Sequence, residues 1–229
     1  MPINRMLRRN EGGPHDDEPF VSDWLRIAAN EIAETDPDLL LRLIRSLFEQ
    51  KVAEARNAAL FTYEYEVNGV SGLEDVFPFL ERGFERGGEL ARPLPPRPID
   101  MARTPILATP WKLQRLINAF EKHGEGRDRG PWRATLNHQV WLYEPIGLPF
   151  VLNGNHSLAM GTFLREGTVT PTEAFDVSEV FRRYRTDGET YRSVDDPTAS
   201  WPVGDLVWAS LFYCGRLLVL ARDRQVATS

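Results

Sequence analysis

The residues best suited to chemistry lie in one polar run, residues 153–157, with the sequence Asn-Gly-Asn-His-Ser. Asn153-Gly154 is typical of a turn, because glycine and, to a lesser degree, asparagine tolerate positive φ. Asn155 can cap a following helix through its side-chain oxygen, which places His156 in the first helical turn. Free N–H groups at a helix start attract anions. The run therefore predicts a strand, turn and helix that form either a plain structural connection or a phosphate site.

Two strand-like segments precede this run and determine which residues lie beside it. Residues 139–143 and 148–152 are apolar and strand-prone, and Pro145-Ile146-Gly147 between them predicts the turn of a hairpin. In such a hairpin His138, at the start of the first strand, approaches the end of the second. His138 and His156 are thus the candidate catalytic groups. No third ligand has a diagnostic spacing, so we predict a polar pocket and no metal site.

A helix and a basic loop lie before the hairpin. Thr109-Pro110 predicts a helix start, with Thr109 as the cap and an apolar face that begins at Trp111. His123-Gly124 predicts its end, and a charged, glycine-rich loop follows from Glu125 to Trp132. The basic residues of this loop region, which are either phosphate ligands or solvated charges, are Arg127, Arg129 and Arg133.

The polar run resembles the signature of the ParB/sulfiredoxin superfamily. There, a strand ends in Gly-x-His-Arg or Gly-Glu-Arg-Arg, a helix follows, and a small residue stands two places after the arginine. An uncharacterised bacterial family often placed near that superfamily is still more similar in its Asn-Gly-Asn-His-Ser box. The resemblance covers at most residues 99–181 and implies that the box binds the phosphates of a nucleotide. The matching positions are Gly154, Asn155, His156, Ser157 and Ala159.

Two positions depart from the superfamily pattern. Asn155 stands where sulfiredoxin has its catalytic cysteine, so the resemblance does not imply sulfur reduction. Ser157 stands where an arginine usually holds the phosphate, and Arg127, Arg129 and Arg133 are candidates to replace it. Superfamily members include nucleotide hydrolases, a kinase and nucleases, so the resemblance implies nucleotide hydrolysis or phosphoryl transfer, with a nucleoside triphosphate and Mg²⁺. The alternative is a non-enzymatic protein-interaction module that keeps the fold but has lost the phosphate clamp.

Composition excludes several classes of protein. The formal net charge of −6 and the pI of about 5.4 argue against a general affinity for nucleic acid. Cys214 is the single cysteine, which excludes an internal disulfide and is typical of a reducing, cytoplasmic environment. No apolar stretch is long enough to cross a membrane, and the basic start of the chain lacks the apolar segment of a secretory signal.

The whole chain is predicted to be α+β, with a helical N-terminal region before a small mixed domain that resembles the ParB/sulfiredoxin fold. Helix starts near Ser22 and at Asp36-Pro37 predict a helical hairpin that could bind a partner protein or a second copy of the chain. Residues 205–222 predict a buried closing helix in which Cys214 is an unreactive core thiol. The predicted units are a tail (1–20), a helical region (21–91), a proline-rich linker (92–103) and the α+β domain (104–229).

Overall fold

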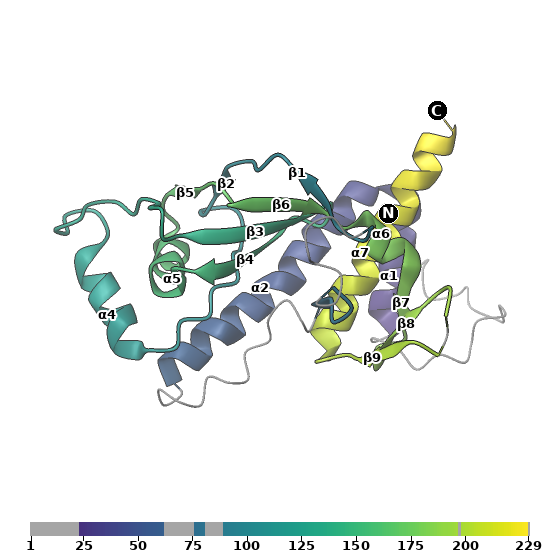
Figure 1. Cartoon of the computed structure of the whole chain (residues 1–229), viewed down its shortest axis with the longest axis horizontal. Helices are drawn as coiled ribbons and strands as arrows, with labels where there is room; N and C mark the ends of the chain where they lie inside the picture. The colour runs from purple at the N-terminus through teal and green to yellow at the C-terminus, as the bar shows by residue number, and fades with distance from the viewer. Residues whose placement is uncertain (1–22, 62–75, 81–88, 197, 229) are drawn as a thin grey trace, which may run out of the picture.

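The computed structural model describes residues 23–61, 76–80 and 89–228, apart from residue 197, and confirms the α+β class (Figure 1). The predicted tail at residues 1–20 lies outside the described residues. The helices are α1 (Asp23–Thr35), α2 (Pro37–Phe61), α4 (Leu113–Lys122), α5 (Asn155–Leu164), α6 (Ser178–Arg183) and α7 (Leu206–Thr228). The strands are β1 (Arg92–Leu94), β2 (Ile99–Asp100), β3 (Gln139–Glu144), β4 (Leu148–Asn153), β5 (Thr168–Val169), β6 (Glu173–Asp176), β7 (Tyr184–Thr186), β8 (Thr190–Ser193) and β9 (Ser200–Pro202).

The largest sheet has the strand order β1-β6-β3-β4. β3 and β4 form the antiparallel hairpin expected from the sequence, while β6 pairs parallel to β3. Two small sheets, β2-β5 and β7-β8-β9, complete the described strands. The hairpin register pairs Gln139 with Asn153, which brings the residue before β3 to the start of α5.

The proline-rich segment at residues 92–103, which the sequence predicts as a linker, contains two strands that each join a ladder. Pro93 pairs with Phe175 in the β1–β6 ladder, and Ile99 pairs with Val169 in the β2–β5 ladder. β1 is an edge strand of its sheet, and one side of an edge strand needs no hydrogen-bond partner, so a proline is tolerated there. The proline cluster therefore connects the helices to the sheets as part of the fold.

The N-terminal helices share a hydrophobic core with the rest of the chain. α2 packs along α7 and contributes Phe48, whose ring lies 5.6 Å from that of Phe150 on β4 and 6.3 Å from that of Trp208 on α7. Alternation along β3 separates two clusters, because Tyr143 belongs to this core and Leu142 to a second one. The second cluster lies between the sheet and α5 and includes apolar residues that pack next to the polar run at residues 153–157.

A buried cation ties α2 to the start of α7. Lys51 is buried, forms ion pairs with Glu54 and Asp205, and lies 5.3 Å from the ring centroid of Trp208. Burial alone would lower the pKa of Lys51, but its hydrogen bonds to Asp205 and Glu54 outweigh this and raise the pKa. Asp205 also caps α7, since its carboxylate accepts the backbone N–H groups of Val207 and Trp208.

The closing helix confirms two expectations. α7 begins where predicted and continues past Arg222, and Cys214 within it is fully buried. Burial raises the pKa of the Cys214 thiol to about 12, so the thiolate needed for nucleophilic chemistry is not populated near neutral pH. Within the part of the chain that the structure describes, no helix is both long enough and apolar enough to cross a membrane.

Candidate functional site

The start of α5 has the backbone geometry that the Asn-Gly pair predicts. Gly154 is the N-cap residue, with φ +87° and ψ +20°, in the left-handed region. The side chain of Asn153 accepts the N–H of Gly154 at 3.0 Å and closes the turn after β4. The first intrahelical bond runs from the N–H of Leu158 to the carbonyl of Gly154. The N–H groups of residues 155–157 therefore have no carbonyl partner within the helix.

Asn155 does not cap α5, which corrects the sequence-based interpretation. It is the first helical residue, and its side-chain oxygen accepts the backbone N–H of Thr109 at 2.7 Å. A parallel bridge between Leu107 and Phe150 brings this segment beside β4 and places Thr109 within reach. Thr109 does not cap α4 either, because α4 begins only at Leu113, after Lys112. Asn155 thus holds the approach to α4 against the start of α5.

His156 faces the turn that precedes α4. Its Nε2 accepts the backbone N–H of Lys112 at 3.1 Å, and its ring meets Trp111 edge-on with centroids 4.5 Å apart. Burial and the nearby charge of Arg115 lower the pKa of His156. An Nε2 that accepts a hydrogen bond is unprotonated, so the neutral ring carries its proton on Nδ1 and can donate it to a ligand.

His138 lies beside the polar run, as the hairpin predicts, but it is buried. Its Nδ1 accepts the N–H of Thr135 at 2.8 Å, and its ring stacks on Trp132 with centroids 5.0 Å apart. A Cβ atom placed on Gly154 would lie 2.6 Å from Cδ2 of His138. Burial and the charge of His123 lower the pKa of His138. This environment favours a packing role for His138 over the catalytic role suggested by its sequence position.

Trp132 packs at the centre of the residues around the start of α5. The sequence analysis treated it only as the last residue of a loop. Its indole N–H donates to the backbone oxygen of Ser157 at 2.7 Å and to its hydroxyl oxygen at 3.0 Å. Its ring fills the space beside Gly161 and Gly167, where an added Cβ would lie 2.9 and 2.5 Å from ring carbons. The sequence did contain one signal of this role. A tryptophan in a polar, glycine-rich loop is a large apolar side chain, and its burial contributes strongly to stability.

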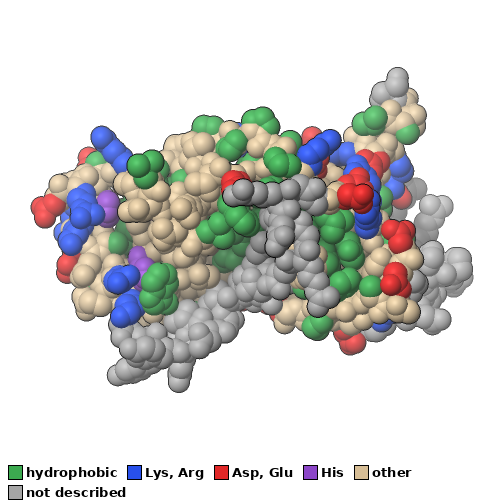
Figure 2. Space-filling view, in the orientation of Figure 1, with side chains coloured by type: hydrophobic (Ala, Val, Ile, Leu, Met, Phe, Trp, Pro, Cys, Tyr) green, Lys and Arg blue, Asp and Glu red, His purple; other side chains and the backbone are tan. Residues whose placement is uncertain are grey.

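The cations closest to His156 come from the turn before α4 and from α4 itself. Lys112 and Arg115 both act on the His156 ring electrostatically, and the Arg115 guanidinium lies 5.9 Å from the ring centroid of Trp111. Basic, histidine and acidic side chains all lie at the α4 end of the molecule (Figure 2). Arg133 is exposed and makes no hydrogen bond to residues 153–157 among the described contacts. Lys112 and Arg115, the cations that act on His156, were not singled out in the sequence analysis.

The described residues contain no group of three or more histidine, cysteine or acidic side chains able to hold a metal ion. The chemistry that the α5 start can offer is anion binding. It presents backbone N–H groups, two cations and a neutral histidine donor around an exposed aromatic ring.

Comparison with known proteins identifies a family whose function is unknown. A model of a family of unknown function, DUF6710, matches residues 19–224. The chain belongs to this family. No curated protein and no solved structure matches it. Because the match extends from the tail into α7, family membership covers both hydrophobic clusters and the α5 start.

The lowered histidine pKa values in this family member predict a loss of stability in acid. His138 and His156 accept backbone N–H bonds as neutral rings, and each has a pKa below its ordinary value of 6.5. As pH falls below about 6.5, these histidines bind protons in the unfolded chain but remain neutral in the native state, so the free energy of unfolding decreases. Each histidine adds a slope of at most about 1.4 kcal/mol per pH unit.

Urea unfolding between pH 7.5 and pH 5.0 measures this effect, with His138→Gln as the test variant. We expect the variant to be less stable at pH 7.5 but to have a shallower decline in acid. An unchanged slope in His138→Gln would show that the titration of His138 does not cause the pH dependence.

Proposed function

We propose that this chain binds a phosphate-bearing ligand of the nucleotide type at the start of α5. The proposal rests on two sets of donors that lie close together. These are the N–H groups of residues 155–157, which have no carbonyl partner within α5, and the cations Lys112 and Arg115. Trp111, which is 43% exposed, adds a ring surface on which a base can stack. The resemblance of residues 153–157 to the ParB/sulfiredoxin box supports the same ligand class.

The proposed contacts follow from the donors present at this position. Phosphate oxygens would accept the N–H groups of the first turn of α5 and the Nδ1–H of neutral His156. Lys112 and Arg115 would neutralise the phosphate charge, and Mg²⁺, if required, would be held through the phosphate oxygens of the ligand. Ser157 contributes its backbone N–H, because its hydroxyl and carbonyl oxygens already accept the Trp132 indole.

Ligand binding is the proposed function. Nucleotide hydrolysis or phosphoryl transfer would be an additional activity, which a separate measurement of phosphate release detects. Of the two candidate catalytic histidines, His138 is buried and His156 already accepts a backbone N–H at Nε2. A general base must have a free nitrogen near the proton it removes, and neither ring offers its accepting nitrogen. We also propose the cytoplasm as the compartment, because the single cysteine, Cys214, is an unpaired buried thiol.

Isothermal titration with ATP, with and without Mg²⁺, tests the proposal directly. The double variant Lys112→Gln/Arg115→Gln should weaken ATP binding by about 30- to 900-fold, since the two charged hydrogen bonds together contribute about 2–4 kcal/mol. Lys122→Gln, at the other end of α4, is the matched control and should bind like the wild type. Because His156 is neutral near pH 7, affinity should not fall between pH 6.5 and 8.

Two results would contradict this function. One is a wild-type protein whose melting curve is not shifted by ATP, since a ligand of the native state must raise apparent stability. The other is a double variant that binds ATP as tightly as Lys122→Gln. Release of phosphate in the titration cell, measured separately, would add hydrolysis to binding.

A second candidate function, protein interaction, is favoured by the exposed apolar residues of α4. Leu113 and Ile117 are partly exposed beside Trp111, whereas the apolar stripe of α2 is buried against α7 and the sheet. Association through the N-terminal helices, as the sequence suggested, would therefore have to use other residues. If α4 mediates self-association, sedimentation should show concentration-dependent dimers that Ile117→Glu abolishes.

A further inference from the structure

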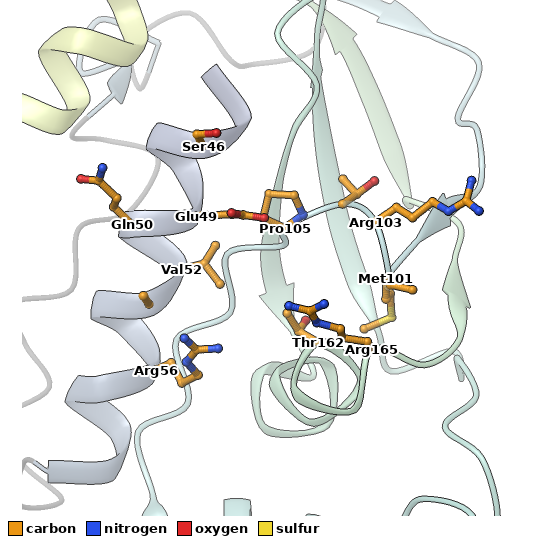
Figure 3. Close-up of a pocket in the computed structure, with 13 residues that line it drawn as sticks. Ser46, Glu49, Gln50, Val52, Arg56, Met101, Arg103, Pro105, Thr162 and Arg165 are labelled. Carbon is orange, nitrogen blue, oxygen red and sulfur yellow. The ribbon is translucent and has the colours of Figure 1, made fainter. Parts of the chain in front are cut away.

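A cavity lies at the opposite end of α5, away from the proposed phosphate site. It has a volume of about 470 Å³ and is bounded by α2, the turn at residues 101–105 and the last turn of α5 (Figure 3). Cavities that hold small organic molecules in proteins fall in the range of about 300–1,000 Å³. Its size therefore fits one small ligand.

Two arginines face each other across this cavity. Arg56 reaches in from α2 and Arg165 from the end of α5, and their guanidinium groups point toward the space between the helices (Figure 3). Neither forms an ion pair with any described residue, although the Arg56 guanidinium lies 5.3 Å from the ring centroid of Phe163. Two like charges on opposite walls favour an anion between them.

The other charged residues of the cavity do not neutralise this pair. Glu49 is the acidic residue among its lining side chains, and it forms no ion pair with Arg56 or Arg165 among the described contacts. Arg103 also lines the cavity but extends away from α2 and pairs with Asp100 at 3.5 Å (Figure 3). The lining as a whole is therefore cationic.

The backbone of Arg165 gives independent support. Arg165 ends α5 in the left-handed conformation, with φ +52° and ψ +43°, and is the non-glycine residue with positive φ among the described residues. Glycine or asparagine is favoured at this position of a helix end. A residue held in such a conformation points to a role for its side chain.

We propose that this cavity binds a small organic anion whose phosphate or carboxylate group lies between Arg56 and Arg165. Arginine presents paired N–H donors that match either oxyanion. Val52, Met101 and Pro105 line the remainder of the cavity and would contact an apolar part of the ligand. The site is separate from the start of α5 and does not depend on nucleotide binding there.

Titration of the full chain with phenyl phosphate and with benzoate tests this site and distinguishes the two oxyanions. We expect at least one probe to bind, and Arg56→Gln and Arg165→Gly each to weaken it at least tenfold. Arg165→Gly should not lower the melting temperature, because glycine adopts the required backbone more easily. Arg42→Gln, which removes an exposed cation of α2 outside the cavity, should bind like the wild type.

The two sites are separated by their variants. Lys112→Gln/Arg115→Gln should leave binding of the preferred probe unchanged, whatever it does to ATP. The proposal is overturned if the wild type binds neither probe at millimolar concentration, or if Arg56→Gln and Arg165→Gly bind like the wild type. An equal loss in Arg42→Gln would also overturn it, since binding would then follow general surface charge.

Discussion

Replacing Trp132 with alanine is expected to lower the free energy of unfolding by about 3–5 kcal/mol, the usual cost of emptying a large aromatic site. Trp132 is 2% exposed, and its indole lies against His138, Gly161 and Gly167. The change also removes the donor to the carbonyl of Ser157 in the first turn of α5. Guanidinium chloride unfolding followed by circular dichroism measures the loss.

Two further variants separate packing from hydrogen bonding at this position. Trp111→Ala, in the same half of the molecule but 43% exposed, should cost less than about 1 kcal/mol, since it leaves no enclosed cavity. Trp132→Phe keeps much of the ring volume and should fall between the two alanine variants, because it still loses the indole N–H bond. Equal costs for Trp132→Ala and Trp111→Ala would contradict the central packing role of Trp132.

Gly154→Ala is expected to destabilise the protein by about 2–5 kcal/mol, combining backbone strain of about 1–2 kcal/mol with an overpacking cost of about 1–3 kcal/mol. Its φ of +87° is unfavourable for alanine. The new methyl group would also lie 2.6 Å from Cδ2 of His138 and 3.1 Å from the carbonyl oxygen of Asn137. Equilibrium urea unfolding at pH 7.5 is the measurement.

Gly126→Ala is the matched control, because Gly126 has a φ of +74° and no atom within 4 Å of an added Cβ. It should cost only the backbone strain, about 1–2 kcal/mol. The difference between the two variants isolates the contact with the His138 segment. In a double-mutant cycle, Gly154→Ala should cost less in a His138→Ala background than in the wild type, since His138→Ala removes the nearest atom. Equal losses for the two glycine variants would refute the steric argument.

Local sequence patterns predicted the elements whose stability comes from their own residues. Residues 139–143 alternate in sequence, with Val140 and Leu142 on one face and Trp141 and Tyr143 on the other, and the structure places Leu142 and Tyr143 in different clusters. The Asn153-Gly154 pair predicted the positive φ at the start of α5, and the apolar stretch after Asp205 predicted α7. These features depend on side-chain periodicity and on backbone preferences, which neighbouring residues carry.

Patterns failed where a distant partner competed for the same atoms. Asn155 would be a sound helix cap in isolation, but Thr109, 46 residues away, takes its side-chain oxygen. The sequence around Pro93 predicts a linker, yet Pro93 lies in the edge strand β1, which pairs with β6, and an edge strand tolerates a proline. In both cases the local preference, for helix capping at Asn155 and for an unpaired segment at Pro93, was outweighed by hydrogen bonding to a residue far away in the sequence.

The sequence by itself determined the α+β class, the hairpin, and the run at residues 153–157 as the most polar turn between strand and helix. Only the tertiary structure decided which atoms of that run remain available to a ligand. Buried polar groups must find partners, so Thr109, Lys112 and Trp132 occupy Asn155, His156 and Ser157 and leave the helix N–H groups and the His156 Nδ1–H. The cavity between Arg56 and Arg165 was equally out of reach of sequence patterns, because its walls come from segments that meet only when the chain folds.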